Sequence, residues 1–111
     1  MEQAITRKRN DTRPIRRVLQ DQQTDGTWGP VDLSGCAVRF LMRDLAGVAV
    51  VAATCTIVNA VGGIVEYDWI IGGGNATAGT YQAEFEVTLG AVVNTYPSDG
   101  YITVAIIPDL G

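Results

Sequence analysis

The amino-acid sequence predicts an all-β fold, a single antiparallel sandwich or barrel of about seven to nine short strands. Hydrophobic and polar residues alternate with a period of two along several segments. Turn sequences rich in glycine, proline, asparagine and aspartate separate these segments. No stretch of about ten or more residues has the periodicity of a helix. The chain has 111 residues, 47% of them hydrophobic and 18% charged, which suits one hydrophobic core and leaves no room for a second domain.

The expected strands follow from this alternation in chain order. They span residues 4–9, 15–20, 36–43, 48–51, 53–58, 63–69, 81–88, 91–96 and 101–107. The pattern is clearest around Tyr81 and Phe85, which share an apolar face while glutamine and glutamate residues alternate with them. Phe40 and Trp69 occupy the same kind of position in their own segments, and Leu41 is an exception to the pattern. We expect the four aromatic side chains in the core and the opposite strand faces in solvent.

The turn before Tyr81 has the sequence of a corner between two sheets. In immunoglobulin-like sandwiches a tyrosine stands at the start of strand F, and its hydroxyl bonds back to the backbone of the corner between the sheets. Gly79 and Tyr81 have the glycine-to-tyrosine spacing of that corner. Antibody domains have a cysteine two residues after the tyrosine, and Ala83 stands there in this chain, so the inter-sheet disulfide is absent. The alternative interpretation is an ordinary core tyrosine at a strand start.

Basic residues are concentrated at the N-terminus. Residues 1–17 hold six of the eight bases against two acids, a net charge of +4, and residues 18–111 hold the other two bases against ten acids, a net charge of −8. We therefore divide the chain into a basic N-terminal arm or edge strand, residues 1–13, and a single immunoglobulin-like domain, residues 14–111. The charges indicate either a solvated edge that resists aggregation or an arm that binds an acidic protein. Nucleic acid is not expected as a partner, because no stacking aromatic residues or basic helix accompany the bases.

The candidate partner-binding residues are the six bases of this segment and one aromatic residue. They are Arg7, Lys8, Arg9, Arg13, Arg16, Arg17 and Trp28. Trp28 is predicted at a hairpin tip, where an indole ring is a suitable anchor for a protein contact. With Asp25 it is also a candidate platform for a sugar, so glycan binding remains open. Arg17 interrupts the apolar alternation between Ile15 and Leu19, which indicates an edge position or an interface.

Catalysis and metal binding are not expected. The chain has no histidine, and histidine is the commonest general base and a common zinc ligand. The carboxylate pairs Glu66/Asp68 and Glu84/Glu86 are each two residues apart on a strand, about 6.5–7 Å, which is wide for a shared calcium ion. We predict no catalytic residue, no metal ligand and no cofactor.

The cysteines and the N-terminal residues indicate folding in a reducing cytosol. Cys36 and Cys55 form no Cys-x-x-Cys motif and are predicted as buried thiols, with a bridge between them left open. No apolar leader is expected at the N-terminus. Residues 46–65 form a 20-residue stretch without a charge, but a Gly62-Gly63 pair interrupts it and small and β-branched residues dominate it. We interpret it as two buried strands and a turn rather than a membrane span.

Six segments in a fixed order add a family resemblance. They read NDT at 10–12, PVDLSG at 30–35, AVRFLMR at 37–43, GIVEYDW at 63–69, ATAGTYQAEFEV at 76–87 and YPSDGYI at 96–102. In this order they resemble the immunoglobulin-like N-terminal domain family of phage baseplate upper proteins, over most of the chain. The sequence departs from the family at Thr27-Trp28-Gly29, which resembles a small insertion at a hairpin tip, and at Gly72-Gly73-Gly74-Asn75, where the family has a more polar turn.

The resemblance implies an immunoglobulin-like antiparallel β-sandwich and a non-enzymatic function. The expected role is that of a phage virion structural protein that docks on other tail or baseplate proteins, after synthesis and folding in the host cytoplasm. One alternative is a capsid decoration or head-completion (neck) protein of the same fold, and a second is a surface glycan-binding module. The expected partners are other virion proteins, with a homo-oligomer also open, and neither nucleic acid nor a membrane is expected.

Overall fold

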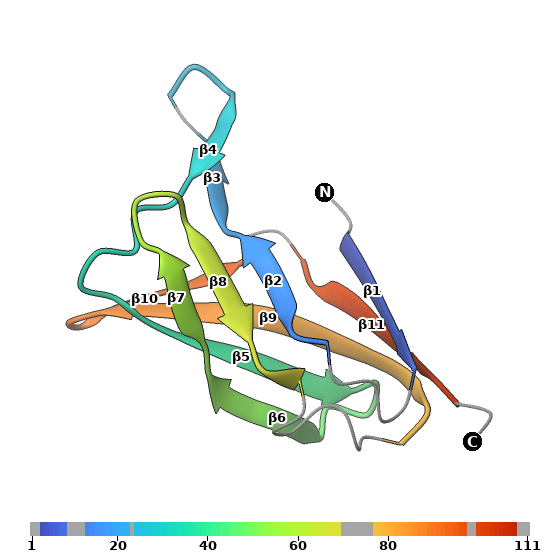
Figure 1. The fold of residues 1–111 in the computed structure, drawn as a ribbon. Coiled ribbons are helices and arrows are strands. Elements are labelled where there is room, and N and C mark those ends of the chain that lie inside the picture. The colour runs from blue at the N-terminus through green and yellow to red at the C-terminus, as the bar shows by residue number, and fades with distance from the viewer. Residues whose placement is uncertain (1–2, 9–12, 23, 70–76, 98–99, 109–111) are drawn as a thin grey trace.

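The computed structural model describes residues 3–8, 13–22, 24–69, 77–97 and 100–108 (Figure 1). Within these ranges the chain is almost entirely β-structure, which confirms the predicted all-β class. The strands are β1 (Gln3–Lys8), β2 (Ile15–Val18), β3 (Gln20–Gln22), β4 (Trp28–Pro30), β5 (Ala37–Asp44), β6 (Ala49–Thr54), β7 (Thr56–Asn59), β8 (Ile64–Tyr67), β9 (Gly79–Leu89), β10 (Val92–Tyr96) and β11 (Ile102–Ile107).

The strands form two sheets and a separate hairpin. The large sheet has the order β1-β11-β9-β5-β6, and β10 also pairs with β9. The small sheet has the order β2-β8-β7, and β3 pairs with β4 alone. All pairs are antiparallel except that of β1 with β11, which is parallel and begins with Gln3 opposite Ile102. The prediction of antiparallel pairing is therefore wrong for this pair. Parallel strands need a long connection between them, and β1 and β11 have one because they lie near opposite ends of the described chain.

Aromatic side chains join the two sheets. The ring of Phe40 on β5 stacks on that of Tyr67 on β8, with 4.6 Å between the centroids. Phe40 also meets Phe85 on β9 edge to face at 5.2 Å, and Trp69 meets Tyr67 in the same way at 6.1 Å. All four rings are fully buried. Because each such side chain stabilises the folded state by about 1.5–3 kcal/mol through burial alone, this cluster holds the large and small sheets face to face.

The number of strands exceeds the predicted range because of the β3–β4 hairpin. Its residues are polar or exposed and show no apolar alternation, so period-two analysis does not detect it. Its turn is held by Asp25, whose Oδ1 accepts bonds from the backbone N–H of Thr27 (3.0 Å) and from its hydroxyl (2.6 Å). Figure 1 shows this hairpin extending beyond the packed sheets.

The first described residues form a strand of the large sheet rather than a free arm. β1 pairs with β11 along its whole length, and Ile5 is buried in the common core. Of the two alternatives for residues 1–13, the edge strand therefore describes residues 3–8.

The uncharged stretch 46–65 contains β6, β7 and the start of β8. β6 and β7 are edge strands of their respective sheets, so the expectation of two buried strands is wrong for part of their surface. Val50 and Val58 are both exposed, because only one face of each strand packs on the core. Among the described residues, no helix is long and apolar enough to cross a membrane.

Candidate functional site

Two edge strands place the basic residues on one side of the sandwich. β1 ends the large sheet and β2 ends the small sheet, and the two are linked where Nη2 of Arg17 donates to the carbonyl oxygen of Ala4 at 3.4 Å. We call the bases here the basic side. Its described members are Arg7, Lys8, Arg13, Arg16 and Arg17. Arg9, the remaining candidate, lies outside the described residues.

Arg17 closes the seam between the sheets. It lies two residues from each of the buried residues Ile15 and Leu19, on the same strand face, and its own side chain is half-buried. Burial, with a smaller contribution from the neighbouring guanidinium of Arg7, lowers the pKa of Arg17. An inward-pointing charge on an edge strand is a known protection against edge pairing. This position accounts for the interruption in the apolar alternation and assigns Arg17 a structural role.

Two more bases have internal contacts. Arg7 donates from Nη1 to the carbonyl oxygen of Thr6 (3.1 Å) and from Nη2 to that of Pro14 (3.4 Å). Arg16 donates from Nε (3.0 Å) and Nη2 (2.8 Å) to Oε2 of Glu66 on β8. That ion pair is exposed and contributes little to stability, but it neutralises the charge of Arg16. Lys8 and Arg13 are exposed on the basic side.

Trp28 lies on the protruding hairpin, in its second strand rather than at the predicted tip, because the turn precedes it. Its side chain is 45% exposed, and it begins β4, opposite Gln22 of β3. The base of the hairpin is tied to β10, because the hydroxyl of Tyr96 donates to Oδ2 of Asp21 at 3.0 Å. The bonds from Thr27 lower the pKa of the Asp25 carboxyl, so an acidic charge stays close to Trp28. The hairpin thus presents an exposed indole ring from an anchored support.

The predicted structural residues take positions at the corner and in the core. The hydroxyl of Tyr81 donates to the carbonyl oxygen of Thr77, the bond expected of a corner between sheets. Gly79, two residues earlier, has a φ of +156°, which other residues rarely adopt. The remaining three, Phe40, Phe85 and Trp69, are in the aromatic cluster between the sheets.

The two cysteines are free thiols. Cys55 is buried at the passage from β6 to β7, and burial raises its pKa to about 12. Cys36 is half-buried just before β5, so the expectation of burial fits Cys55 better than Cys36. A thiol that stays protonated is a poor nucleophile and a poor metal ligand, which gives Cys55 a packing role.

The paired carboxylates considered for calcium have other partners. Glu66 accepts the bonds from Arg16, as described above. Glu86 on β9 accepts two bonds at Oε1 from Arg39 on β5, at 3.0 Å from Nε and 2.9 Å from Nη2. Arg39 and Glu86 lie directly opposite each other in the β5–β9 pairing, which brings their side chains together. Each of the two acidic pairs therefore has one carboxylate engaged in an ion pair across neighbouring strands.

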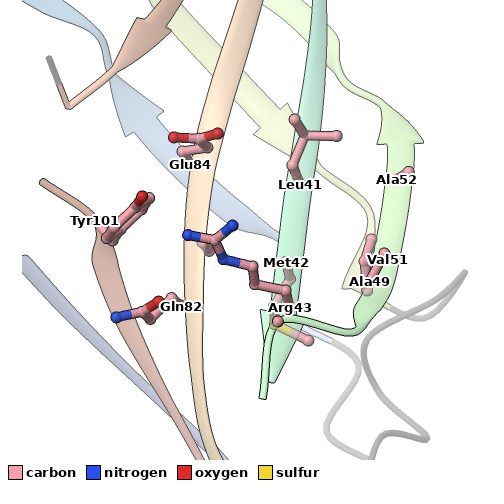
Figure 2. Close-up of a pocket in the computed structure, with 11 residues that line it drawn as sticks. Leu41, Met42, Arg43, Ala49, Val51, Ala52, Gln82, Glu84 and Tyr101 are labelled. Carbon is pink, nitrogen blue, oxygen red and sulfur yellow. The ribbon is translucent and has the colours of Figure 1, made fainter. Parts of the chain in front are cut away.

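Sequence reasoning missed a hollow of about 240 Å³ on the outer face of the large sheet (Figure 2). It is lined by Leu41, Met42, Arg43, Gly47, Ala49, Val51, Ala52, Gln82, Ala83, Glu84 and Tyr101. The guanidinium carbon of Arg43 lies 4.9 Å from the centre of the Tyr101 ring, a cation–π contact between residues far apart in the chain. The one signal in the sequence was Leu41, the apolar residue on the otherwise polar face of its strand.

Among the described residues, the exposed bases, Trp28 and the hollow are features suited to binding a partner. Compared with protein-family models and with curated proteins, the chain matches none. Function is therefore inferred from the geometry of the chain itself and from the resemblance of its segments.

Proposed function

We propose that this chain is a non-enzymatic, immunoglobulin-like structural module of a phage virion that docks on other tail or baseplate proteins. Two supports are independent of each other. The first is the strand order, which supports an immunoglobulin-like topology, and the second is the resemblance of the six segments noted above to a family of baseplate domains. The docking itself is supported most directly by the exposed Trp28 on its anchored hairpin.

The sheet order supports the immunoglobulin-like topology. In variable-type immunoglobulin domains, strands B, E and D belong to one sheet and G, F, C and C′ to the other. β2, β8 and β7 have the order of the first group, and β11, β9, β5 and β6 have the order of the second. The chain passes between sheets where that topology requires it, and the hydroxyl of Tyr81 bonds back to Thr77 at the start of the strand that corresponds to F.

The charge distribution supports an acidic protein as the docking partner. Lys8 and Arg13 are exposed on the basic side, while most of the remaining chain is acidic. Exposed charges guide association and choose the partner more than they contribute affinity, and their effect is screened by salt. Trp28 then supplies the apolar anchor. We expect binding that weakens as the salt concentration rises and is lost when the indole is removed.

Paired variants test the docking surface. Trp28→Ala and Lys8→Gln should each reduce incorporation into particles, because they remove an exposed anchor and an exposed charge. Arg16→Gln is the matched control, since Glu66 already neutralises that base. Deletion of residues 1–9 is less informative, because it removes β1 and uncovers β11. Normal incorporation of both Trp28→Ala and Lys8→Gln would refute docking through these residues.

The number of copies in purified particles decides between the tail and capsid alternatives. Quantitative mass spectrometry against the major capsid protein gives this ratio directly. Far fewer copies than capsid subunits support a tail or baseplate component. A simple ratio to the capsid protein supports capsid decoration, whereas absence from the particle contradicts both. In that last case binding of a glycan by Trp28, with the Asp25 carboxylate close by, becomes the function to test.

A further inference from the structure

The two lateral sides of the sandwich differ in charge. The basic side carries arginines and a lysine along β1 and β2. On the opposite side β6 ends the large sheet and β7 ends the small sheet (Figure 1). Both strands lie within residues 46–65, which contain no charged side chain. We call β6 with Val48, which precedes it, the uncharged edge.

The uncharged edge lacks two common protections of an edge strand, a charged residue and a proline, and its pairing with β5 has one register shift, between Met42 and Arg43. Within the described part of the chain, β6 pairs with β5 on one side and with no strand on the other. Its free side therefore presents backbone N–H and C=O groups that another strand can pair with. Charged or proline residues commonly prevent this, and residues 48–54 contain neither. Val48 is 61% exposed and Val50 38% exposed, so apolar side chains accompany the free backbone groups.

β10 also carries no charged residue, and it has a different neighbour. Its last residue, Tyr96, donates to the carboxylate of Asp21 on β3. An acidic group therefore stands at the end of that strand. Strand addition along β10 would meet this charge, whereas strand addition along β6 meets none within residues 46–65.

We propose that the uncharged edge pairs with the same edge of a second copy of this chain, antiparallel and about a two-fold axis. A two-fold contact places a surface opposite its own copy, so a charged edge repels itself and an uncharged edge does not. Among the lateral edges of the two sheets, the absence of charge favours β6 and β7 over β1 and β2, and β6 is the longer of the two, with six residues against four. The pairing joins the large sheets of two copies into one continuous sheet and covers Val48 and Val50.

Salt separates this contact from the docking contact. The chain has a net charge of −4, and residues 18–111 alone carry −8, so two copies repel each other at long range. Salt screens that repulsion. The contact at β6 contains no attractive pair of charges that salt could weaken. Self-association should therefore strengthen as salt rises, whereas binding of an acidic partner to the basic side should weaken. Failure of either proposal leaves the other standing.

Sedimentation velocity of the purified chain tests self-association directly. We expect a species of twice the monomer mass whose fraction rises with protein concentration and with salt. A chain that stays monomeric at every concentration in high salt overturns the proposal. So does a dimer that dissociates as salt is added, because that dimer depends on opposite charges.

Charge variants at Val50 locate the contact. Val50→Lys and Val50→Glu should each lower the association constant at least about tenfold, because each places like charges opposite one another. An equimolar mixture of the two variants should associate again. Val61→Lys is the matched control: it adds the same charge within the same uncharged stretch, at a residue 71% exposed in the turn before β8. Equal loss in Val61→Lys, or no recovery in the mixture, refutes pairing through β6.

A folding control accompanies these variants. Circular dichroism and thermal unfolding show whether Val50→Lys retains the native fold. If it does not, Ala52→Lys and Ala52→Glu replace the pair, because Ala52 is also exposed on β6. Folded variants at Ala52 that associate like the unchanged chain would overturn the proposal.

Discussion

Gly63 joins three segments of the fold and is the most sensitive backbone position we identify. It has a φ of +68°, and a Cβ atom built on it would lie 2.7 Å from the carbonyl oxygen of Leu19 and 2.8 Å from that of Val31. These segments are bonded to one another: Leu19 N–H donates to the Gly63 oxygen (2.8 Å) and Val31 N–H to the Leu19 oxygen (2.9 Å). Neither carbonyl can move away from an added methyl group without breaking the network.

Gly63→Ala should therefore have two destabilising effects. The positive φ costs about 1 kcal/mol for any residue with a Cβ atom. The clash with two fixed carbonyl groups adds about 2 kcal/mol, as overpacking of an interior does. Gly90 isolates the first effect, because its φ is +60° and a Cβ atom there meets nothing within 4 Å. We expect a loss of about 3 kcal/mol for Gly63→Ala and about 1 kcal/mol for Gly90→Ala.

Thermal unfolding followed by circular dichroism measures the difference. At this chain length, 1 kcal/mol lowers the Tm by roughly 4 °C, so we expect falls of roughly 12 °C for Gly63→Ala and roughly 4 °C for Gly90→Ala. Urea unfolding gives the free energies independently. Equal losses in the two variants would refute the close approach of Leu19 and Val31 to Gly63, because only the shared φ would then matter.

Three further predictions concern side chains. Tyr81→Phe removes the hydrogen bond to Thr77 without leaving a cavity, and the exposed Thr77 can bind water instead. Urea unfolding should therefore show a free energy of unfolding lower by about 1 kcal/mol. No change would mean that the corner bond does not stabilise the fold. Alkylation of the native protein should label Cys36 well before Cys55, whose pKa of about 12 keeps it protonated; equal labelling rates would contradict its burial. Burial raises the pKa of Tyr96 from 10.0 to about 12, and the nearby Asp21 carboxylate is a smaller cause. The folded state therefore holds this proton more tightly, so the associated stability is fully present below pH 10 and lost as the pH rises through about 12. Ultraviolet titration of the unchanged chain and of Tyr96→Phe should differ by one tyrosine that ionises near pH 12, and a difference near pH 10 would contradict the contact.

Sequence reasoning was most successful where structure depends on local pattern. The alternation around Tyr81 and Phe85 correctly placed both side chains in the core, as it did Phe40 and Trp69. Burial on one face of a strand repeats every two residues, so it is visible in any strand with one solvated face. The strands β3 and β4 have no such face, so the alternation did not predict them, although the turn residues did predict a hairpin here.

The basic segment shows what pattern alone leaves undecided. Its charge was visible in the sequence, but the alternatives of free arm and edge strand were not distinguishable there. The structure pairs β1 with β11 at the far end of the chain, directs Arg17 into the seam between the sheets and pairs Arg16 with Glu66. Each of these depends on contacts between residues distant in sequence. Lys8, Arg13 and Arg16 are the described bases of this side whose side chains are exposed.

By itself, the sequence determined the all-β class, the faces of the main strands, the turn glycines and the unequal distribution of charge. Only the tertiary structure decided the sheet order, the contact of Arg43 with Tyr101, the close approach at Gly63 and the position of β6 at a free edge. The reason is physical. The direction in which a side chain points follows from local backbone geometry, whereas strand pairing and register depend on which distant segments bury their apolar faces together.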